Sequence, residues 1–410
     1  MTIDLEALFI DLHRNPELSF QEVRTAAIAA GHLRDLGLDV TEGIGQTGVI
    51  GVLRNGSSAS TAAGPVVWLR ADMDALPVVE ESGLPYASTA MGVDPEGHEV
   101  GIMHACGHDM HVTAMIGAVE ELVRTKDEWS GTVVVVIQPA EEYGAGARAM
   151  LDDGALDRFP RPDVVLGQHV TPFPTGVIGV RPGPQMSASD GLHVVLHGRG
   201  GHGSRPHSTI DPIVMAAATV MRLQTVVSRE VDPHDLAVVT VGAIHAGTKN
   251  NIIPAEATLE LSLRYPDDAL RTKVLADVER IIRAEAMASG ATEDPTIETL
   301  HTLPATINDA SATERATAAF RAAFGDDRVI DPGLFTGSED VSWFARDAGV
   351  PLVFWFWGGV DPARYAAAVA AGTVDSEIAT NHSPFFAIEI HPTIEIGVRA
   401  LTVAAREFLG

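Results

Sequence analysis

Cysteine is nearly absent from this 410-residue sequence, whose single thiol, Cys106, has no partner for an intrachain disulfide. The fold must therefore depend on a packed core, and apolar residues, at 46%, are ample for one. Basic residues are also few, with 28 Lys+Arg against 55 Asp+Glu and a formal charge of -27. This acidity would repel phosphate groups, so we expect no nucleic acid and no anionic membrane as a partner.

Long apolar runs are missing as well. No stretch approaches the ~20 uninterrupted apolar residues that a membrane span needs, and Met1–Arg14 carries acids instead of a basic region that leads into an apolar one. We therefore expect a cytoplasmic protein without membrane contact. Arg54–Gly64 is rich in Ser, Ala and Gly, and we predict a mobile turn there.

Short apolar runs predict a mainly parallel sheet. Runs that are apolar throughout, instead of alternating, are typical of strands covered on both faces, and four of them occur: Val66–Arg70, Thr132–Gln138, Val164–Gly167 and Leu352–Trp357. Helical spacing lies between them, as in Val112–Thr125. Near the N-terminus, Asp4–Leu38 is predicted to form two helices, and Ser19 with Glu22 fits a capping box.

The middle third has a different pattern. From Leu192–His197 to Thr296–Leu300 the expected order is β-α-β-β-α-β, that of a ferredoxin-like module. A chain of this length also favours two domains. We therefore predict an α/β fold, in which a mainly parallel-sheet catalytic domain, residues 1–184 and 304–410, carries an inserted ferredoxin-like α+β domain, residues 185–303.

The densest group of chemically active side chains runs from His104 to His111. It holds three histidines, a thiol and an acid just before a helical segment. A lone cysteine is by default a small buried hydrophobe. Here, however, Cys106 and His108 stand two residues apart and can converge on one ion, and a thiolate with an imidazole favours zinc or a similar metal.

Further polar side chains follow the predicted strands. Asp72 and Asp74 follow the first, Glu141 and Glu142 the second, and His169 the third. Adjacent acids point in different directions, so one can coordinate a metal while the other accepts a proton, although two solvated surface acids would be the ordinary interpretation. Because ligands bind beyond the carboxyl ends of parallel strands, we expect these residues in one site.

Eight segments in order resemble one enzyme family, that of the aminoacylases, hippurate hydrolases and indole-acetyl-amino-acid hydrolases, within the clan of two-metal exopeptidases and deacylases. One such motif would be weak, but eight in sequence are highly specific. They are Trp68–Pro77, Met103–His111, Gln138–Glu142, Gly167–His169, Gly200–His207, Asn251–Pro254, Gly337–Asp340 and Asn381–Pro384.

The resemblance implies one or two divalent ions per subunit, zinc, manganese or cobalt. It implies as ligands Cys106, in a position that could bridge two ions, with His108, Glu142, His169 and His382. Glu141 would be the general base that takes a proton from metal-bound water and later delivers it to the leaving amine. Asp74 would orient a ligand, and Asp72 and Asp109 would assist.

The inserted domain is similar to the family's lid and dimerisation domain, which implies a homodimer or higher homo-oligomer. His202 matches the histidine that stabilises the developing oxyanion from a neighbouring subunit. Asn251 and Arg264 match residues that bind the substrate carboxylate. An arginine fork suits a carboxylate, yet Arg264 could equally be a strand residue paired with a local acid.

The expected reaction is hydrolysis of the amide bond of a small N-acyl or N-aminoacyl amino acid, with benzoyl, acetyl, indole-acetyl, longer and aminoacyl groups all open. A dipeptidase or carboxypeptidase of the same clan is the alternative. A non-catalytic metal- or peptide-binding relative would have no need of Glu141. Gly198–Gly203 fits a dinucleotide-binding pattern, but the helix after it starts too late. Cys106 as a nucleophile would leave several histidines and two acids without roles.

Overall fold

The computed structural model describes residues 2–56 and 64–410, which form two compact units. The first unit comprises Met1–Gln185, Ile307–Gly333 and Asp340–Gly410, and the second comprises Met186–Thr306 and Leu334–Glu339. Most of the predicted turn over Arg54–Gly64, residues 57–63, lies outside the described residues. Within the described chain, every helix is too short or too polar to traverse a lipid bilayer.

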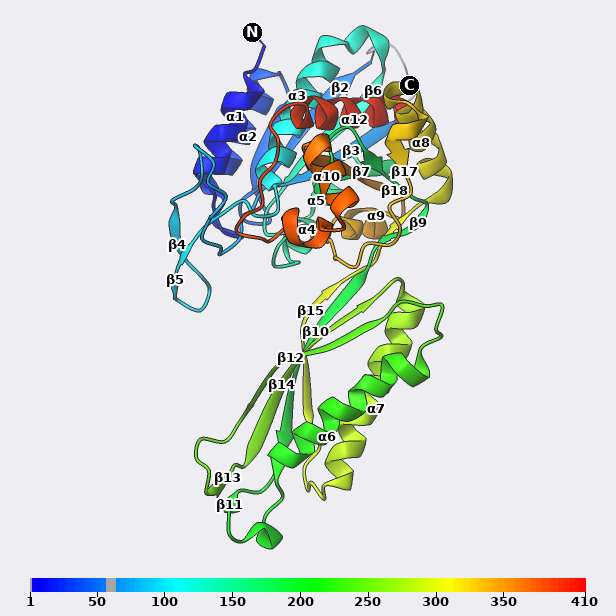
Figure 1. Cartoon of the computed structure of the whole chain (residues 1–410). Coiled ribbons are helices and arrows are strands. Elements are labelled where there is room, and N and C mark those ends of the chain that lie inside the picture. The colour runs from blue at the N-terminus through cyan, green and yellow to red at the C-terminus, as the bar shows by residue number, and fades with distance from the viewer. Residues whose placement is uncertain (1, 57–63) are drawn as a thin grey trace. The chain divides into compact units, whose positions relative to one another are not determined.

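An eight-stranded sheet in the order β1-β2-β6-β3-β7-β18-β8-β17 forms the centre of the first unit (Figure 1). Neighbours among β6, β3, β7 and β18 are parallel, while β1 and β2 are antiparallel additions at one side. The mainly parallel sheet is thus confirmed. The strands are β1 (Asp39–Ile44), β2 (Gly48–Asn55), β3 (Val66–Asp72), β6 (Gly131–Gln138), β7 (Val164–Pro174), β8 (Ile178–Gly179), β17 (Val329–Ile330) and β18 (Leu352–Val360).

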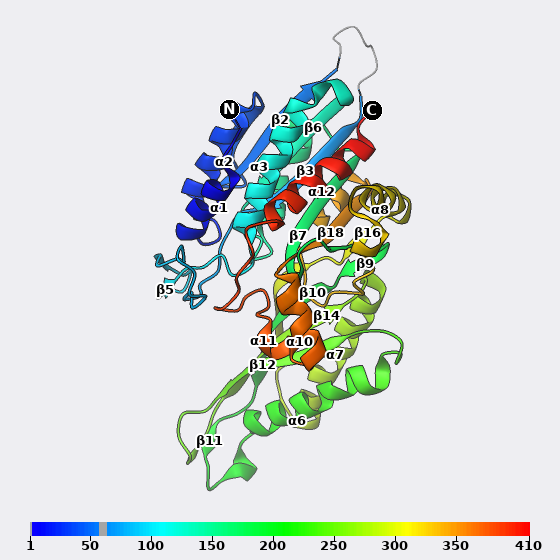
Figure 2. The same cartoon turned by 45° about the horizontal axis from the view of Figure 1, so that its top comes forward.

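Helices cover this sheet, and α3 and α12 lie side by side against it (Figure 2). The apolar runs of β6 and β18 are buried along their length, which explains why both lack polar alternation. The helices of this unit are α1 (Leu5–Arg14), α2 (Val23–Asp35), α3 (His108–Arg124), α4 (Gly146–Asp152), α5 (Ala155–Arg158), α8 (Ala310–Phe324), α9 (Ser342–Ala348), α10 (Pro362–Ala371), α11 (Val374–Glu377) and α12 (Thr393–Phe408).

The second unit has the predicted β-α-β-β-α-β order. Its four-stranded antiparallel sheet runs β12-β14-β10-β15, and buried side chains of both long helices form a separate core with it. Its main elements are β10 (Ala188–His197), α6 (Pro212–Thr225), β12 (Val238–Ala246), β14 (Glu256–Tyr265), α7 (Asp268–Ala288) and β15 (Thr296–Leu303). This unit also has a two-stranded sheet of β11 (Gly201–His202) and β13 (Ile252–Ile253). Elsewhere in the chain, β4 (Met91–Val93) pairs with β5 (Glu99–Gly101), and β9 (Gly183–Met186) pairs with β16 (Thr306–Asn308).

The predicted capping box at the start of α2 is wrong. Glu22 stands at the N-cap but makes no side-chain cap bond, and Ser19 bonds away from the helix. The carboxylate of Glu17 instead accepts the N–H groups of Arg24, at 2.9 Å, and Thr25, at 2.7 Å. Sequence spacing identified the right type of residue, but groups from distant segments compete for Ser19 and Glu22.

Candidate metal centre

The acids that follow β3 and β6 come together at the carboxyl ends of these strands. Asp72 is the last residue of β3 and is paired with Gln138, the last residue of β6. Asp74 lies two residues further on, and its Oδ2 accepts the backbone N–H of Glu142 at 3.1 Å. Both aspartates are fully buried. Adjacent parallel strands therefore deliver the two acidic loops to one place, as parallel-sheet topology requires.

The start of α3 brings a thiol and an imidazole to the same place. The helix begins at His108, earlier than its apolar spacing indicated, and Gly107 before it has a φ of 82°. A Cβ there would lie 2.5 Å from Cγ1 of Val170. Both the left-handed backbone and the lack of space require glycine at this position. The tight turn places Cys106 and His108 on either side of it.

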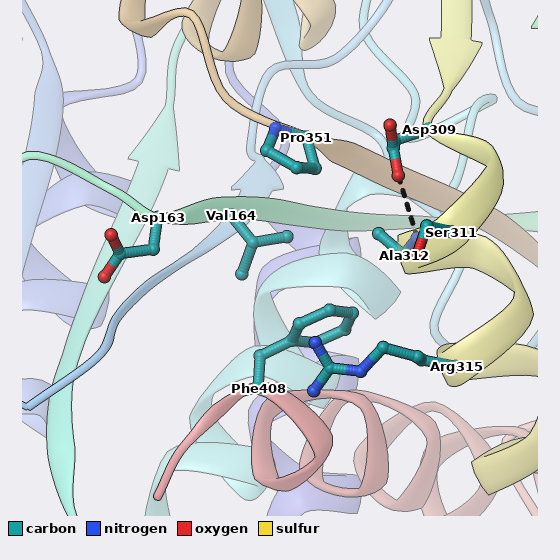
Figure 3. A pocket seen from close by; sticks show the side chains of 8 residues that line it. All are labelled: Asp163, Val164, Asp309, Ser311, Ala312, Arg315, Pro351 and Phe408. Atoms are coloured by element: carbon teal, nitrogen blue, oxygen red, sulfur yellow. Dashed lines mark hydrogen bonds between the residues drawn. The ribbon is translucent and has the colours of Figure 1, made fainter.

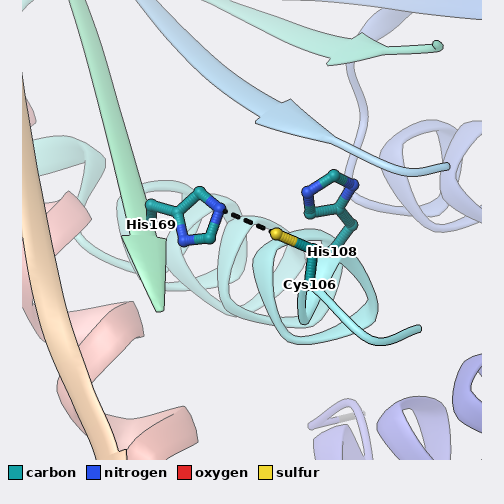
Figure 4. A group of neighbouring side chains, drawn as sticks. All are labelled: Cys106, His108 and His169. Atoms are coloured by element: carbon teal, nitrogen blue, oxygen red, sulfur yellow. Dashed lines mark hydrogen bonds between the residues drawn. The ribbon is translucent and has the colours of Figure 1, made fainter. Parts of the chain in front are cut away.

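Two groups of potential metal ligands share Cys106. In one, ligand atoms of Cys106, His108 and His169 lie within 4.8 Å of one another, and Sγ of Cys106 is 3.4 Å from Nε2 of His169 (Figure 4). In the other, Cys106 is grouped with Glu142 and His382 within the same limit. The structure thus brings together all five predicted ligands. Sγ of Cys106 belongs to both groups.

Hydrogen bonds orient two of the imidazoles. Nδ1 of His108 lies 3.2 Å from Oδ1 of Asp74, and Nδ1 of His169 donates to the carbonyl of Val170 at 2.7 Å. Each bond leaves Nε2 facing the shared space, the arrangement in which a histidine binds a metal. Nε2 of His108 and Oε1 of Glu142 are buried 3.8 Å apart, and neither has a hydrogen-bond partner in the described part of the chain. A divalent cation fits this requirement.

His382 and its neighbour close the group from the C-terminal segment. His382 has a φ of 70°, its N–H donates to the carbonyl of Ala105 at 2.7 Å, and its Nε2 lies 3.4 Å from Oε2 of Glu142. Asn381 donates to the carbonyls of Cys106 and Val170, both at 3.2 Å. The sequence placed Asn381 in a motif, but only the structure shows that it ties the thiol-bearing turn to β7.

The electrostatics of the group also call for positive charge. Burial raises the pKa of the Cys106 thiol well above its usual value, and the carboxylates of Glu142 and Glu141 raise it further. Burial raises the pKa of Glu142 to about 7, although His108 opposes this. Burial would lower the pKa of His108, but Asp72 and Asp74 raise it to about 10. The thiol, the carboxyl group and the imidazole therefore share protons in a buried site that has several negative groups. A divalent ion bound there would supply the positive charge instead.

Glu141 stands beside the ligands. It is 7% exposed, and its Oε2 lies 3.9 Å from Nε2 of His108. The residue before it, Ala140, is buried and has a φ of 46°. Since a left-handed conformation is uncommon for alanine, this turn is held by its surroundings.

The rings of His108 and His111 stay side by side, 5.2 Å apart between centroids, but the two histidines differ in their hydrogen bonds. Nδ1 of His111 bonds Asp72, and its Nε2 accepts the N–H of Val170 at 2.9 Å, so both nitrogens are engaged. Asp72 in turn accepts from the buried guanidinium of Arg70 at 2.7 Å, and Arg70 also donates to Asp340 at 3.0 Å. His111 and Asp72 therefore bond to each other, and His111 also bonds to the residue next to a predicted ligand.

Asp109 is turned away from the ligands. Its Oδ2 lies 2.7 Å from Nδ1 of His13, whose Nε2 lies 3.2 Å from Oε1 of Glu80. Burial would lower the pKa of His13, but the bonds to Asp109 and Glu80 raise it to about 9. Nothing in the sequence pattern indicated His13, because its partners are 67 and 96 residues away.

The second unit carries the other predicted site residues. His202 pairs with Ile252 across β11 and β13, and the carbonyl of Asn251 accepts the N–H of Gly203 at 2.8 Å, so His202 and Asn251 are neighbours. Arg264 lies near the far end of β14, where its Nη1 donates to Oγ of Ser338 at 2.7 Å. The structure therefore does not bring Arg264 to the other two.

The amino ends of the strands carry a separate hollow of about 300 Å³ (Figure 3). Val164 at the start of β7 and Pro351 just before β18 contribute to its wall. Its polar groups have structural partners: Asp309 caps α8, and Arg315 donates to Glu407. Among the described residues, the lining of this hollow includes no cysteine or histidine, in contrast to the opposite end of the sheet.

The chain is similar to proteins of a known family. The family described as Peptidase family M20/M25/M40 matches residues 68–405. Thermostable carboxypeptidase 2 of Saccharolobus solfataricus is 37% identical over 352 residues, 85% of this chain and 84% of that protein. Hippurate hydrolase of Campylobacter jejuni is 37% identical over 345 residues, 84% of this chain and 85% of that protein. The crystal structure of a dinuclear metal-binding peptidase from Bacillus subtilis has a TM-score of 0.76 at 29% identity, covering 98% of this chain and 96% of that one.

Proposed function

Because the chain belongs to peptidase family M20/M25/M40 and is a metal-dependent amidohydrolase, we propose that it hydrolyses the amide bond of small N-acyl amino acids. The products are a carboxylic acid and a free amino acid. One observation carries the proposal: a buried thiol, imidazoles and a carboxylate converge beside a second carboxylate at Glu141, and two of the ligand atoms have no hydrogen-bond partner among the described residues.

We assign the metal to Cys106, His108, Glu142, His169 and His382, with Cys106 common to two positions. A divalent ion held there would act as a Lewis acid towards water and the amide carbonyl. Asp74 and the carbonyl of Val170 keep two of the imidazoles in the ligating tautomer.

Glu141 acts as the general base and then the general acid. Its carboxylate takes the proton of the attacking water and delivers it to the leaving nitrogen, which departs as a neutral amine. Its position supports this role, since Oε2 is 3.9 Å from the ligating Nε2 of His108. Burial of Cys106, His108 and Glu141 strengthens the electrostatic interactions among them.

A free carboxylate next to the scissile amide is the recognition element that we propose for the substrate. Hippurate hydrolase and carboxypeptidase, the names of two relatives, both denote cleavage of an amide whose amine carries such a carboxylate. A carboxypeptidase is accordingly the second candidate, favoured by its equal identity of 37%. Arg264 is half-buried, and among the described residues its guanidinium donates to the Thr336 carbonyl and the Ser338 hydroxyl and not to a carboxylate, which supports its assignment to the substrate.

The separation of His202 and Arg264 supports a homodimer. About eight residues of β14 divide them, which corresponds to roughly 25 Å of strand, longer than a small acylated amino acid. A substrate held by Arg264 therefore needs His202 from a second chain to stabilise its oxyanion. Exposed apolar side chains on α6, Val214 at 63% and Met221 at 72%, offer a surface for such a partner, as does β12 at the edge of its sheet.

Paired variants of the two adjacent glutamates test the proposal. In Glu141→Gln, kcat for an N-acyl amino acid should fall by roughly 100- to 10,000-fold, the contribution of a general acid–base residue, while metal content is retained. In the matched variant Glu142→Gln, metal content itself should fall because a ligand is lost. Metal is measured by elemental analysis and kcat with metal supplied in excess.

Two outcomes would contradict the proposal. Near-normal turnover by Glu141→Gln would remove the base assignment, and full activity of the wild-type protein after chelation and dialysis would remove the metal. The substrate class is tested with an N-acyl amino acid and its C-terminal amide, since only the acid should be cleaved efficiently. Preference for N-blocked dipeptides over acylated amino acids would select the carboxypeptidase alternative.

A further inference from the structure

The carboxylate of Glu22 holds the turn that carries the catalytic acids. Its side chain is completely buried, and its Oε1 accepts the N–H of Ala140 at 2.8 Å and that of Phe20 at 2.9 Å. Its Oε2 accepts the hydroxyl of Thr47 at 2.6 Å. Three donors from three separate segments thus fix one carboxylate, and one of these donors directly precedes Glu141.

The Ala140 turn needs such a restraint. Its φ of 46° lies in the left-handed region, which costs a residue with a Cβ roughly 1–2 kcal/mol. On its other side, the carbonyl of Ala140 accepts the N–H of Gly146 at 3.1 Å. The peptide groups on both sides of Ala140 are therefore hydrogen-bonded, and the backbone direction into Glu141 is set between them.

The neighbouring Ser19 restrains the same loop by a second route. Its hydroxyl donates to Oδ2 of Asp74 at 2.6 Å, and the same oxygen accepts the N–H of Glu142 at 3.1 Å. The segment before α2 thus contacts the loop immediately before Glu141, through Glu22, and indirectly at Glu142. The pair of residues that resembles a helix cap serves the catalytic loop instead.

We propose that Glu22 is a positioning residue for Glu141, an inference that rests on the proposed role of Glu141 as general base. Glu22 contacts the residue directly before Glu141. It acts by accepting the N–H of Ala140, which keeps the turn left-handed and the Glu141 carboxylate at a constant distance from the ligands. Misplacement of a catalytic group by about 1 Å can cost 100-fold in rate, so this backbone bond is expected to affect kcat.

The test shortens the Glu22 side chain and keeps its charge. In Glu22→Asp, the carboxylate withdraws by one methylene from the N–H of Ala140, and we expect kcat to fall by roughly tenfold or more with KM and metal content almost unchanged. Glu22→Gln retains an oxygen for the two N–H groups, while its amide can donate to Thr47, and it should keep most of the activity. This rescue by the conservative variant separates bond geometry from charge.

Glu17 provides the matched control. Its carboxylate also accepts two backbone N–H groups at the start of α2, but both belong to the helix itself. Glu17→Asp should therefore lower the melting temperature to a similar extent as Glu22→Asp while it leaves kcat within about twofold of wild type. A merely structural role for Glu22 would give the two variants the same kcat.

Equal kcat in Glu22→Asp and Glu17→Asp, with Glu141→Gln inactive, would overturn the positioning role and leave the proposed base intact. Normal activity in Glu141→Gln would overturn the base assignment and the positioning role with it. A selective loss of kcat in Glu22→Asp, with recovery in Glu22→Gln, would support both. If Glu22→Asp does not fold, Thr47→Val in the intact chain loosens the same carboxylate through its other oxygen, and an unchanged kcat there would count against the role.

Discussion

Replacement of Asp74 by asparagine tests how the metal ligands are oriented. The carboxylate accepts three bonds: from Nδ1 of His108 at Oδ1, and from the Ser19 hydroxyl and the Glu142 N–H at Oδ2. An asparagine has one oxygen and one donor group in the same volume. If its oxygen faces Ser19 and Glu142, its NH₂ group faces Nδ1 of His108. If it is flipped, its NH₂ group faces the Glu142 N–H.

Either orientation weakens the metal site. In the first, Nδ1 of His108 must accept a hydrogen bond, so the proton moves to Nε2 and occupies the ligating position. In the second, two donors oppose each other at the loop that carries Glu142. Loss of such a partner behind a ligating histidine typically costs 10- to 100-fold in metal affinity, or about 1.4–2.8 kcal/mol. We expect a loss in this range for Asp74→Asn.

Competition between the protein and a chromophoric chelator measures this affinity at constant pH. Asp163→Asn serves as the control, since the side chain of Asp163 accepts the N–H of Val66 at the opposite end of β3, away from the metal ligands. Once metal is saturating, Asp74→Asn should recover much of its kcat, because its defect is in occupancy. Unchanged affinity in Asp74→Asn, or an equal loss in Asp163→Asn, would refute the argument that Asp74 fixes the tautomer of His108.

Two further predictions concern His13, which bonds Asp109 and Glu80, and His202 in the second unit. The pKa of His13 is raised from 6.5 to about 9, so its charged form contributes stability that is complete below pH 6.5 and lost as pH rises through 9. In His13→Gln, the free energy of unfolding measured in urea should lose roughly 3 kcal/mol of its pH dependence in this window. His391→Gln, at an exposed ion pair, should lose much less. Parallel plots of unfolding free energy against pH for wild type and His13→Gln would contradict this. Inactive His202→Ala and Glu141→Gln proteins, refolded together, should regain about a quarter of wild-type activity if His202 acts in trans, and no recovery would place it in cis.

The sequence predicted much of the fold because burial constrains composition directly. A strand such as β18, covered on both faces, has no position for a charged side chain, so its apolar run is visible without any knowledge of its neighbours. The second unit was equally accessible, since β14 alternates between buried and exposed residues and α7 has helical periodicity. The first residues of helices were harder to predict. The apolar spacing of α3 starts at Val112, but the helix starts at His108, because its first turn carries mainly polar residues.

The donor set was predictable for a different reason. Only a few residue types bind a borderline divalent metal, so the combination of Cys106, His108 and the acids after β6 predicts a metal site. Residue type alone does not distinguish a metal ligand from a residue that holds a ligand in place. His108 and His111 are three residues apart on one helix, yet one leaves Nε2 unpartnered within the described residues and the other has both nitrogens bonded.

The residues whose roles sequence patterns missed act through long-range hydrogen bonds. Ser19 and Glu22 fit a local capping rule, but their bonds reach Asp74 and Ala140, which are 55 and 118 residues away. A local rule fails here because a buried carboxylate accepts from whichever donors the fold leaves without partners. The N–H of Ala140, in a turn with a φ of 46°, is such a donor. Glu22 therefore binds the backbone of the loop that carries Glu141, whereas Glu17, five residues earlier, binds the first N–H groups of α2.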